Sequence, residues 1–294
     1  MALLFLVSLI WAFSFGLIKG NLAGIDSTFV AFARLFIATL VFLPFLKIKN
    51  VDWKTRLQLA FTGLVQFGLM YIFYLAAFQS LQAYEVALFT IFTPIFVTLT
   101  DDLFSRRFNL LHLVVALVTV AGTWVIEGEA LQTQAVWIGF ILVQASNVCY
   151  AFGQIYYRRI MGQHPELHDH QVFGLLYIGG VVVTLLATLF LTPLNLIAVS
   201  GKQLLTLIYL GAIASGLSFF LWNIGGRRVN AGTLAVFNDL KIPLAVVVSL
   251  LIFDEQADLV RLIVGGSIII GALVFNEKLN KKVASFPDPK TPAS

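Results

Sequence analysis

Charged side chains are scarce in this sequence, and their scarcity argues against a soluble globular protein. Lys, Arg, Asp and Glu make up 12% of the 294 residues, whereas apolar residues make up 59% and the mean hydropathy is +0.92. A soluble chain of this length could not stay in solution with that balance. The formal net charge is only +4, which gives no indication of nucleic-acid binding. We therefore expect lipid to be the main solvent of the chain.

Cysteine and the common catalytic motifs are also missing or nearly so. The single cysteine, Cys149, cannot form an internal disulfide. The sequence contains no phosphate-binding loop, nucleophile elbow or metalloprotease motif, so we expect no enzyme activity and no cofactor. The histidine-rich stretch 164–170 resembles a metal-ligand cluster in composition. Because a second group of ligands is missing, we expect no metal site there.

Long apolar runs dominate the chain instead. A helix needs roughly 20 residues to cross the hydrocarbon core, and only helices or closed barrels satisfy their own backbone in lipid. The runs are too long and too evenly apolar for barrel strands, so we expect an all-α membrane protein. Ten transmembrane helices are predicted near residues 2–19, 28–46, 57–78, 84–100, 110–126, 135–157, 171–191, 203–224, 232–252 and 262–275.

The distribution of basic residues supports this count and predicts an orientation. Fourteen Lys and Arg residues fall in the connections on one side of the ten spans, and only Lys19, Lys202 and Arg261 fall on the other. Short cytoplasmic loops collect positive charge. We therefore expect a multi-pass protein of the bacterial inner membrane with both termini in the cytoplasm.

The chain also contains an internal repeat. Residues 12–18 match 149–155, and Gly68 and Pro94 match Gly216 and Pro243 further along. We expect two five-helix repeats, residues 1–126 and 135–275, followed by a disordered cytoplasmic tail, 276–294. Because five is an odd number, the second repeat enters the membrane from the opposite face, which makes the topology inverted. Inverted repeats are typical of transporters that work by alternating access, although duplication for stability alone is the competing interpretation.

This pattern resembles the drug/metabolite transporter superfamily, and in particular proteins with two EamA-type domains. The resemblance covers residues 2–275 and rests on 11–15, 33–35 and 92–96, and on 241–243 through Glu255 and Gly271. It implies a carrier of a small organic solute with a central cavity lined by spans three, four, eight and nine. We expect export of an amino acid or related metabolite by a monomer or weak homodimer. The alternatives are a lipid flippase or scramblase and a non-catalytic membrane sensor.

Ionisable residues inside the predicted spans are the first candidates for the site, because each should face a cavity or a partner. Lys241 lies near the middle of the ninth span and is expected either to receive an anionic group of the solute or to form a structural ion pair. Asn238 and Asp239 lie on the same helix, and Asp239 could couple transport to protons or pair with an arginine. Arg34 and Glu85 lie toward the same side and could pair with each other as structural or coupling charges.

Prolines and repeat-matched aromatic residues complete the candidate site. Pro94 and Pro243 each remove a backbone hydrogen bond at matching places and are expected to kink their helices, either for gating or for packing. Aromatic and amide side chains near the repeat-matched positions are expected to form a largely apolar substrate pocket. These are Trp11, Tyr71, Tyr74, Tyr150, Phe219, Trp222, Asn147 and Asn223.

Overall fold

A computed structural model describes residues 2–49, 51–106, 134–193, 195, 197–228 and 231–253, with isolated positions between 260 and 274. For residues 231–240 and 243 it describes the backbone alone. Every regular element within these residues is helical. In chain order they are α1 (Ala2–Asn21), α2 (Ser27–Phe42), η1 (Leu43–Phe45), α3 (Trp53–Gly63), η2 (Leu64–Leu69), α4 (Met70–Ala77), α5 (Ala83–Phe89), η3 (Thr90–Phe92), α6 (Thr93–Ser105), α8 (Gln134–Gln163), α9 (Asp169–Leu191), α10 (Gly201–Tyr209), η6 (Leu210–Leu217), α11 (Ser218–Arg227) and α12 (Ala231–Ile252).

Consecutive elements join into long rods. Among the described residues, seven of these rods are long and apolar enough to cross a membrane, and they cover the first four predicted spans and the sixth to the eighth. The 22-residue α12 covers the ninth. The fifth predicted span, 110–126, lies outside the described residues, as does most of the tenth, 262–275. The all-helical membrane fold is therefore confirmed, whereas the count of ten and the inversion of the repeats stay predictions.

Polar residues fix where several helices begin. The Asp26 carboxylate accepts hydrogen bonds from the backbone N–H groups of Thr28 and Phe29 at the start of α2. The Asp52 carboxylate does the same for the Thr55 N–H at the start of α3. Such N-caps satisfy backbone donors that have no partner inside the helix. The short polar stretches between the apolar runs therefore determine the helix boundaries.

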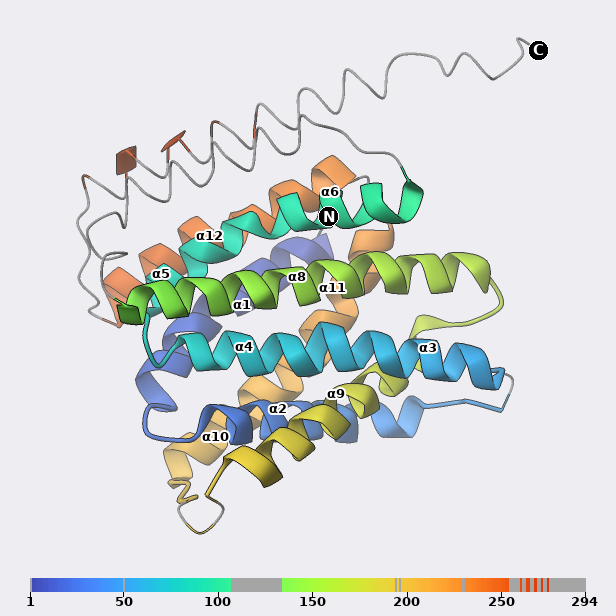
Figure 1. Ribbon diagram of the computed structural model, residues 1–294, viewed down its shortest axis with the longest axis horizontal. Helices are drawn as coiled ribbons and strands as arrows, with labels where there is room; N and C mark the ends of the chain where they lie inside the picture. The colour runs from blue at the N-terminus through green and yellow to red at the C-terminus, as the bar shows by residue number, and fades with distance from the viewer. Residues whose placement is uncertain are drawn as a thin grey trace.

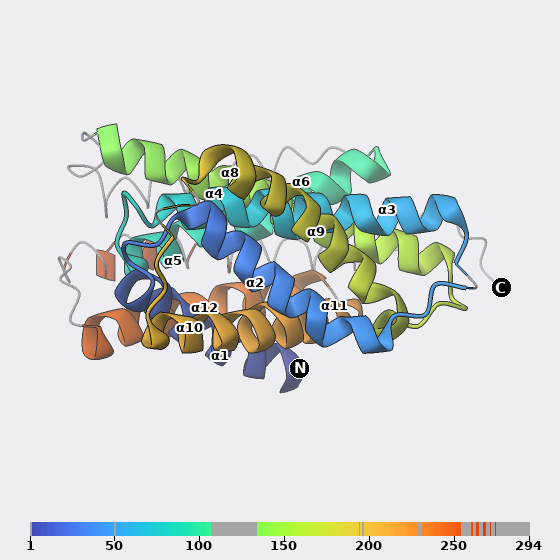
Figure 2. The ribbon, with the colours of Figure 1, turned by 90° about the horizontal axis from the view of Figure 1, so that it is seen from below.

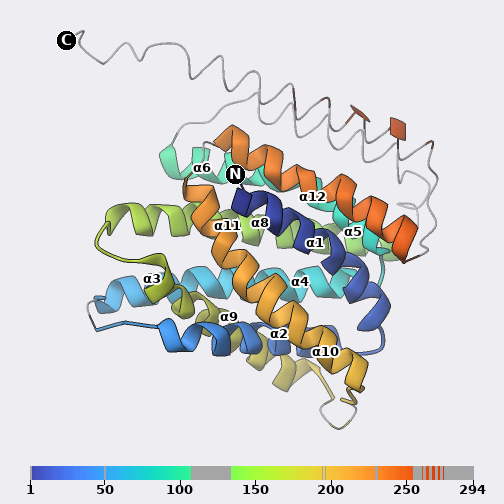
Figure 3. The same cartoon turned by 180° about the vertical axis from the view of Figure 1, so that it is seen from behind.

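The third and eighth predicted spans share an unusual feature. In each, a π-helical segment lies between two α-helical parts: η2 lies between α3 and α4, which run on as one coil in Figure 1, and η6 lies between α10 and α11, which run on as one coil in Figure 3. The two segments contain Gly68 and Gly216, the glycines that match between the repeats. In a π-helix the hydrogen bonds widen from i→i+4 to i→i+5, and such turns are frequent at functional sites.

The predicted kinks at the two prolines differ between the halves. The fourth span is divided into α5, the 3₁₀ turn η3 and α6, and Pro94 lies in the first turn of α6. A proline fits there because the first turn needs no backbone donor. By contrast, α12 continues as one helix through Pro243. The described backbone of α12 therefore has no interruption that matches the one at Pro94.

Close backbone contacts hold the bundle together. Helix α1 lies beside α12 (Figure 3), and α9 packs against both α2 and α3 (Figure 2). At the crossing of α3 and α9, a Cβ atom added to Gly63 would overlap the backbone of Leu176, and one added to Gly179 would overlap the carbonyl of Ala60. Only glycine permits this approach of two helices.

The outer surface of the bundle is apolar. Large side chains such as Phe190, Leu103 and Leu251 are 82%, 77% and 76% exposed. A soluble protein rarely exposes contiguous apolar surface, whereas lipid-facing helices do. Several of the buried polar residues, among them Arg34, Asn147 and Lys241, meet in one place between the helices.

Candidate substrate cavity

A cavity between the helices brings together side chains from both halves of the chain. It contains about 540 Å³ of empty space, its open mouth included. The lining comes from α1, α2, α4, η3, α6, α8, α11 and α12, which is more than the four spans that the family resemblance implies. The lining residues are Trp11, Ser14, Phe15, Arg34, Met70, Tyr71, Tyr74, Thr90, Thr93, Ser146, Asn147, Tyr150, Phe219 and Lys241.

Seven of the eleven residues predicted for the substrate pocket lie in this lining, together with Arg34. The seven are Trp11, Tyr71, Tyr74, Asn147, Tyr150, Phe219 and Lys241. Two more, Trp222 and Asn223, line a neighbouring pocket with Gln154 instead. The side chains of Asn238 and Asp239 lie outside the described residues. The structure therefore brings most of the predicted set together around one space.

Trp222 and Asn223 have local roles that explain their separate position. Trp222 is fully buried, its ring centre lies 4.9 Å from that of Trp11 with the two planes tilted, and its indole N–H donates to the Gln154 side chain at 3.2 Å. Asn223 donates to the Phe219 carbonyl one turn earlier at 2.8 Å. Trp222 thus lies behind the wall of the cavity rather than in it.

Arg34 is the more deeply enclosed of the two cationic residues in the lining. It is 2% exposed. Its Nε donates to Ser215 Oγ at 3.1 Å, and its Nη2 donates to the Tyr71 hydroxyl at 2.8 Å. The guanidinium carbon also lies 4.4 Å from the centre of the Tyr71 ring, a cation–π distance. The side chain is therefore held by two neutral residues.

The pairing of Arg34 with Glu85 suggested by the sequence is not the contact observed. Arg34 bonds to Tyr71 and Ser215, while the Glu85 carboxylate accepts from the backbone N–H of Gln82 at 2.6 Å. That bond belongs to a capping box at the start of α5. The first turn of a helix favours a carboxylate because of its unpaired N–H groups, which explains the position of Glu85.

Lys241 approaches the cavity from the opposite half of the chain. It is 6% exposed, and its Nζ lies 5.2 Å from the ring centre of Trp11 and 5.8 Å from that of Tyr150. Aromatic faces carry negative quadrupole charge and stabilise a nearby ammonium. Lys241 therefore contacts the aromatic wall, as the sequence interpretation requires of a cavity residue.

Aromatic rings form most of the wall. The Phe219 ring lies 5.9 Å from Tyr71, 5.8 Å from Tyr150 and 5.0 Å from Trp11. Trp11 donates its indole N–H to the carbonyl of Ala214 in η6 at 2.9 Å. The π-helical segment thus supplies a carbonyl that fixes the orientation of an aromatic wall residue from α1.

Several hydroxyl side chains that line the cavity were not predicted from the sequence. Thr90 and Thr93 lie where η3 joins α6, and Thr93 donates to the Asn147 side chain at 3.1 Å. Asn147 in turn donates to the Phe89 carbonyl at 2.9 Å. Ser146 lies beside Asn147 on α8. Serine and threonine barely alter hydropathy, so only the Thr–Pro step at 93–94 marked this region in the sequence.

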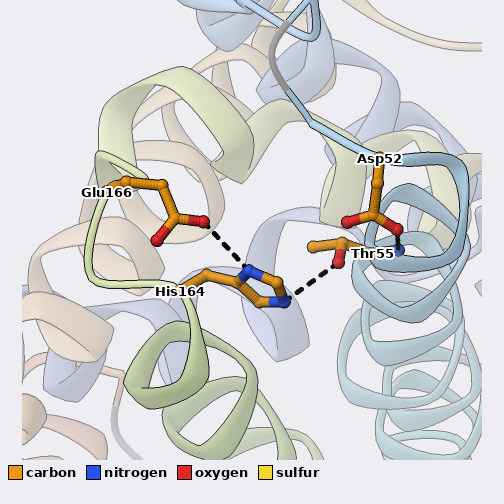
Figure 4. Close-up of polar contacts among 4 residues, drawn as sticks. All are labelled: Asp52, Thr55, His164 and Glu166. Carbon is orange, nitrogen blue, oxygen red and sulfur yellow. Dashed lines mark hydrogen bonds and ion pairs between the residues drawn. The ribbon is translucent and has the colours of Figure 1, made fainter.

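A second polar cluster, away from the cavity, joins two connections (Figure 4). His164 contacts the Thr55 hydroxyl through Nε2 at 3.1 Å and the Glu166 carboxylate through Nδ1 at 3.0 Å. Hydrogen bonds from the Thr55 hydroxyl and backbone keep the pKa of Asp52 below its ordinary value. Both ring nitrogens of His164 thus have protein partners. No group of three or more potential metal ligands is found among the described residues.

The comparison with family models identifies this architecture. The model of the EamA-like transporter family matches the chain twice, over residues 1–128 and 137–277. The chain belongs to the EamA-like transporter family. The family resemblance seen in the sequence is thereby confirmed, and the protein is a multi-pass membrane transporter of a small solute.

Individual relatives match along nearly the whole chain. A protein of Pseudomonas aeruginosa named "Probable biotin transporter" is 39% identical over 96% of this chain and 99% of its own length. Proteins named "Biotin transporter" from Salmonella typhimurium and Escherichia coli are each 35% identical over 95% of this chain and 93% of their own length. One solved crystal structure shares the fold with a TM-score of 0.69 at 17% identity, covering 96% of this chain and 99% of that chain.

Proposed function

We propose that this protein carries biotin across the membrane by alternating access, with the substrate held in the cavity between the two halves. The observation that carries the proposal is the similarity to proteins named biotin transporters, at 35–39% identity over 95–96% of the chain. Similarity of that extent runs along nearly the whole chain rather than over a single motif.

The chemistry of the lining supports the same substrate. Biotin combines a carboxylate on a methylene chain with a compact fused ring that carries a ureido group. Arg34 and Lys241 supply positive charge, and Trp11, Tyr71 and Phe219 supply apolar surface. Binding sites for small organic molecules are mostly apolar with a few well-placed polar groups.

One further group suits the ureido end of the molecule. The buried hydroxyl of Tyr150 has no hydrogen-bond partner among the described residues, and Tyr150 lines the cavity. A buried polar group without a partner costs free energy, and a bound ureido carbonyl or N–H would remove that cost. The pocket thus offers polar groups suited to both ends of biotin.

Uptake by the purified protein tests the proposal. Proteoliposomes that contain the protein should accumulate radiolabelled biotin in exchange for unlabelled biotin inside, and protein-free liposomes should not. Radiolabelled amino acids and fluorescent phospholipids serve as competing substrates in the same vesicles. Exchange of an amino acid or a lipid without exchange of biotin would refute the proposal.

The earlier alternatives gain no support from the relatives. Their names do not refer to amino-acid export, to lipid movement or to sensing. The finer expectation of an exported amino acid is therefore replaced by biotin, and the assay above measures exchange regardless of direction.

A further inference from the structure

Arg34 has a terminal nitrogen that no described residue uses. The side chain is 98% buried, being 2% exposed. Its Nη1 is buried and has no hydrogen-bond partner within the described part of the chain, whereas its Nε and Nη2 each have one. Among the described residues, Arg34 forms no ion pair with a carboxylate. A guanidinium in this state is unusual, because buried charges are normally paired and buried donors are normally satisfied.

The neighbours of Arg34 fix its orientation completely. Ser215 donates its single hydroxyl hydrogen to the carbonyl of Leu210 at 2.7 Å. In the 2.8 Å contact between Ser215 and Tyr71, the hydrogen must therefore come from Tyr71. The Tyr71 oxygen then accepts from Arg34 Nη2, and Ser215 Oγ accepts from Arg34 Nε. The hydrogens of this triad that remain unassigned are the two on Nη1 and the second one on Nη2.

The backbone behind the triad is equally constrained. Ser215 lies in η6, whose carbonyls also accept hydrogen bonds from side chains of other helices. Tyr177 from α9 donates to the carbonyls of Ser215 and Gly216 at 2.8 and 2.7 Å. Three helices, α2, α4 and α9, therefore meet at one turn of η6. A guanidinium held in this way is pre-organised to bind an anion with little further loss of entropy.

We propose that Arg34 Nη1 receives the carboxylate of the substrate, and that Tyr71 and Ser215 are positioning residues that present it. This inference rests on the proposed function in taking biotin as the solute. It makes the carrier selective for solutes with a free carboxylate, because a neutral amide or ester cannot compensate the buried charge. The free energy of a hydrogen bond to a charged group corresponds to an affinity for the carboxylate that is roughly 10- to 100-fold higher than for the neutral amide or ester.

Competition by matched ligands tests the assignment. Biotin and biotinamide differ only in the carboxylate, and each is titrated against radiolabelled biotin uptake. The parent protein should prefer biotin by about 10- to 100-fold. The Arg34→Gln variant should bind biotin more weakly by that factor, whereas its apparent affinity for biotinamide should stay within about twofold of the parent value. Preserved preference in a folded Arg34→Gln protein would overturn the inference, as would an equal loss for both ligands.

Milder variants separate positioning from folding. Tyr71→Phe keeps the ring beneath the guanidinium and removes only the hydroxyl, so it should raise the KM for biotin with the maximal rate retained. Arg34→Lys keeps the charge but has a single nitrogen, so it lacks the extra terminal nitrogen that Nη1 offers beyond the bonds to Ser215 and Tyr71, and its preference should be intermediate. A preference for biotin that neither variant reduces would contradict the positioning role.

A second ligand pair makes the result independent of biotin transport. Lipoate and lipoamide differ in the same way, and their stabilisation of the purified protein against heat can be measured directly. Lipoate alone should stabilise the parent protein, and Arg34→Gln should abolish the difference. If biotin is not transported but this difference is seen, the proposed function fails and the carboxylate site stands. If biotin is transported but neither ligand pair is discriminated, the proposed function stands and the assignment of Arg34 as the carboxylate site fails.

Discussion

The packing can be tested at the crossing of α3 and α9, because one glycine from each helix lies at that crossing. A methyl group at Gly63 would overlap the backbone of Leu176, and one at Gly179 would overlap the carbonyl of Ala60. Neither neighbour is the flexible end of a side chain. The helices must therefore separate, and a gap of about 1 Å forfeits up to roughly half of each dispersion well along the crossing.

We expect Gly63→Ala and Gly179→Ala each to destabilise the protein by about 1–3 kcal/mol, the usual cost of overpacking. Because one separation relieves both overlaps, the double variant should cost less than the sum of the single variants. Gly162 in α8 is the matched control, since an added methyl there meets no atom within 4 Å. Gly162→Ala should be neutral or stabilise by up to roughly 1 kcal/mol.

Unfolding in mixed micelles with increasing denaturing detergent measures these differences. The reasoning is refuted if the two crossing variants are as stable as the parent, or if Gly162→Ala is destabilised as strongly as they are. Additive costs in the double variant would show that the two methyl groups act at separate contacts.

Three further predictions concern charge and topology. Lys241→Met should cost roughly 0.5–2 kcal/mol of stability through the lost cation–π contacts with Trp11 and Tyr150, and it should lower biotin exchange because it removes one of the two positive charges of the cavity lining; a loss of stability of roughly 3–5 kcal/mol would instead indicate a structural ion pair. Burial raises the pKa of Asp26, but hydrogen bonds from Thr28, Thr192 and Phe29 outweigh it and hold the pKa below its ordinary value of 3.8. The ionised carboxylate therefore stabilises the fold above pH 3.8 and loses this effect as the pH falls through the lowered pKa. Asp26→Ala should cost about 1 kcal/mol at neutral pH, and a difference from the parent that did not shrink in melts below pH 3.8 would contradict this. A reporter fused after Ser294 should be active as a cytoplasmic fusion and one in the loop 127–134 as a periplasmic fusion; exchanged activities would refute the orientation.

The helical membrane fold and much of the cavity lining follow from the sequence for simple reasons. Long apolar runs predict membrane helices directly. An ionised residue inside such a run must face a polar group or a cavity, and this argument identified Arg34 and Lys241 as candidates. Their partners could not be predicted in this way. Arg34 bonds to Ser215, 181 positions away, and no local pattern reports a contact of that range. Glu85 seemed a suitable partner for Arg34 because of its charge and its depth in the membrane. Its carboxylate instead accepts a hydrogen bond from the Gln82 N–H at the start of its own helix.

Backbone irregularities were predicted unevenly. Pro94 lies at an interrupted span, but α12 passes through Pro243 as one helix, because surrounding packing can tolerate a proline within a helix. The π-helical segments were not predicted at all, since their residues are ordinary helix formers apart from the matched glycines. Hydrogen-bond register, unlike hydropathy, is decided by long-range contacts such as those of Trp11 and Tyr177 with η6.

The paired π-helical segments also bear on how the chain arose. The wider i→i+5 hydrogen bonds of a π-turn enclose one more residue than those of an α-turn, so inserting a single residue into an α-helix can produce one. The segments Leu64–Leu69 and Leu210–Leu217 carry the matched Gly68 and Gly216. One insertion that preceded the duplication of the predicted repeat would account for both segments with a single event.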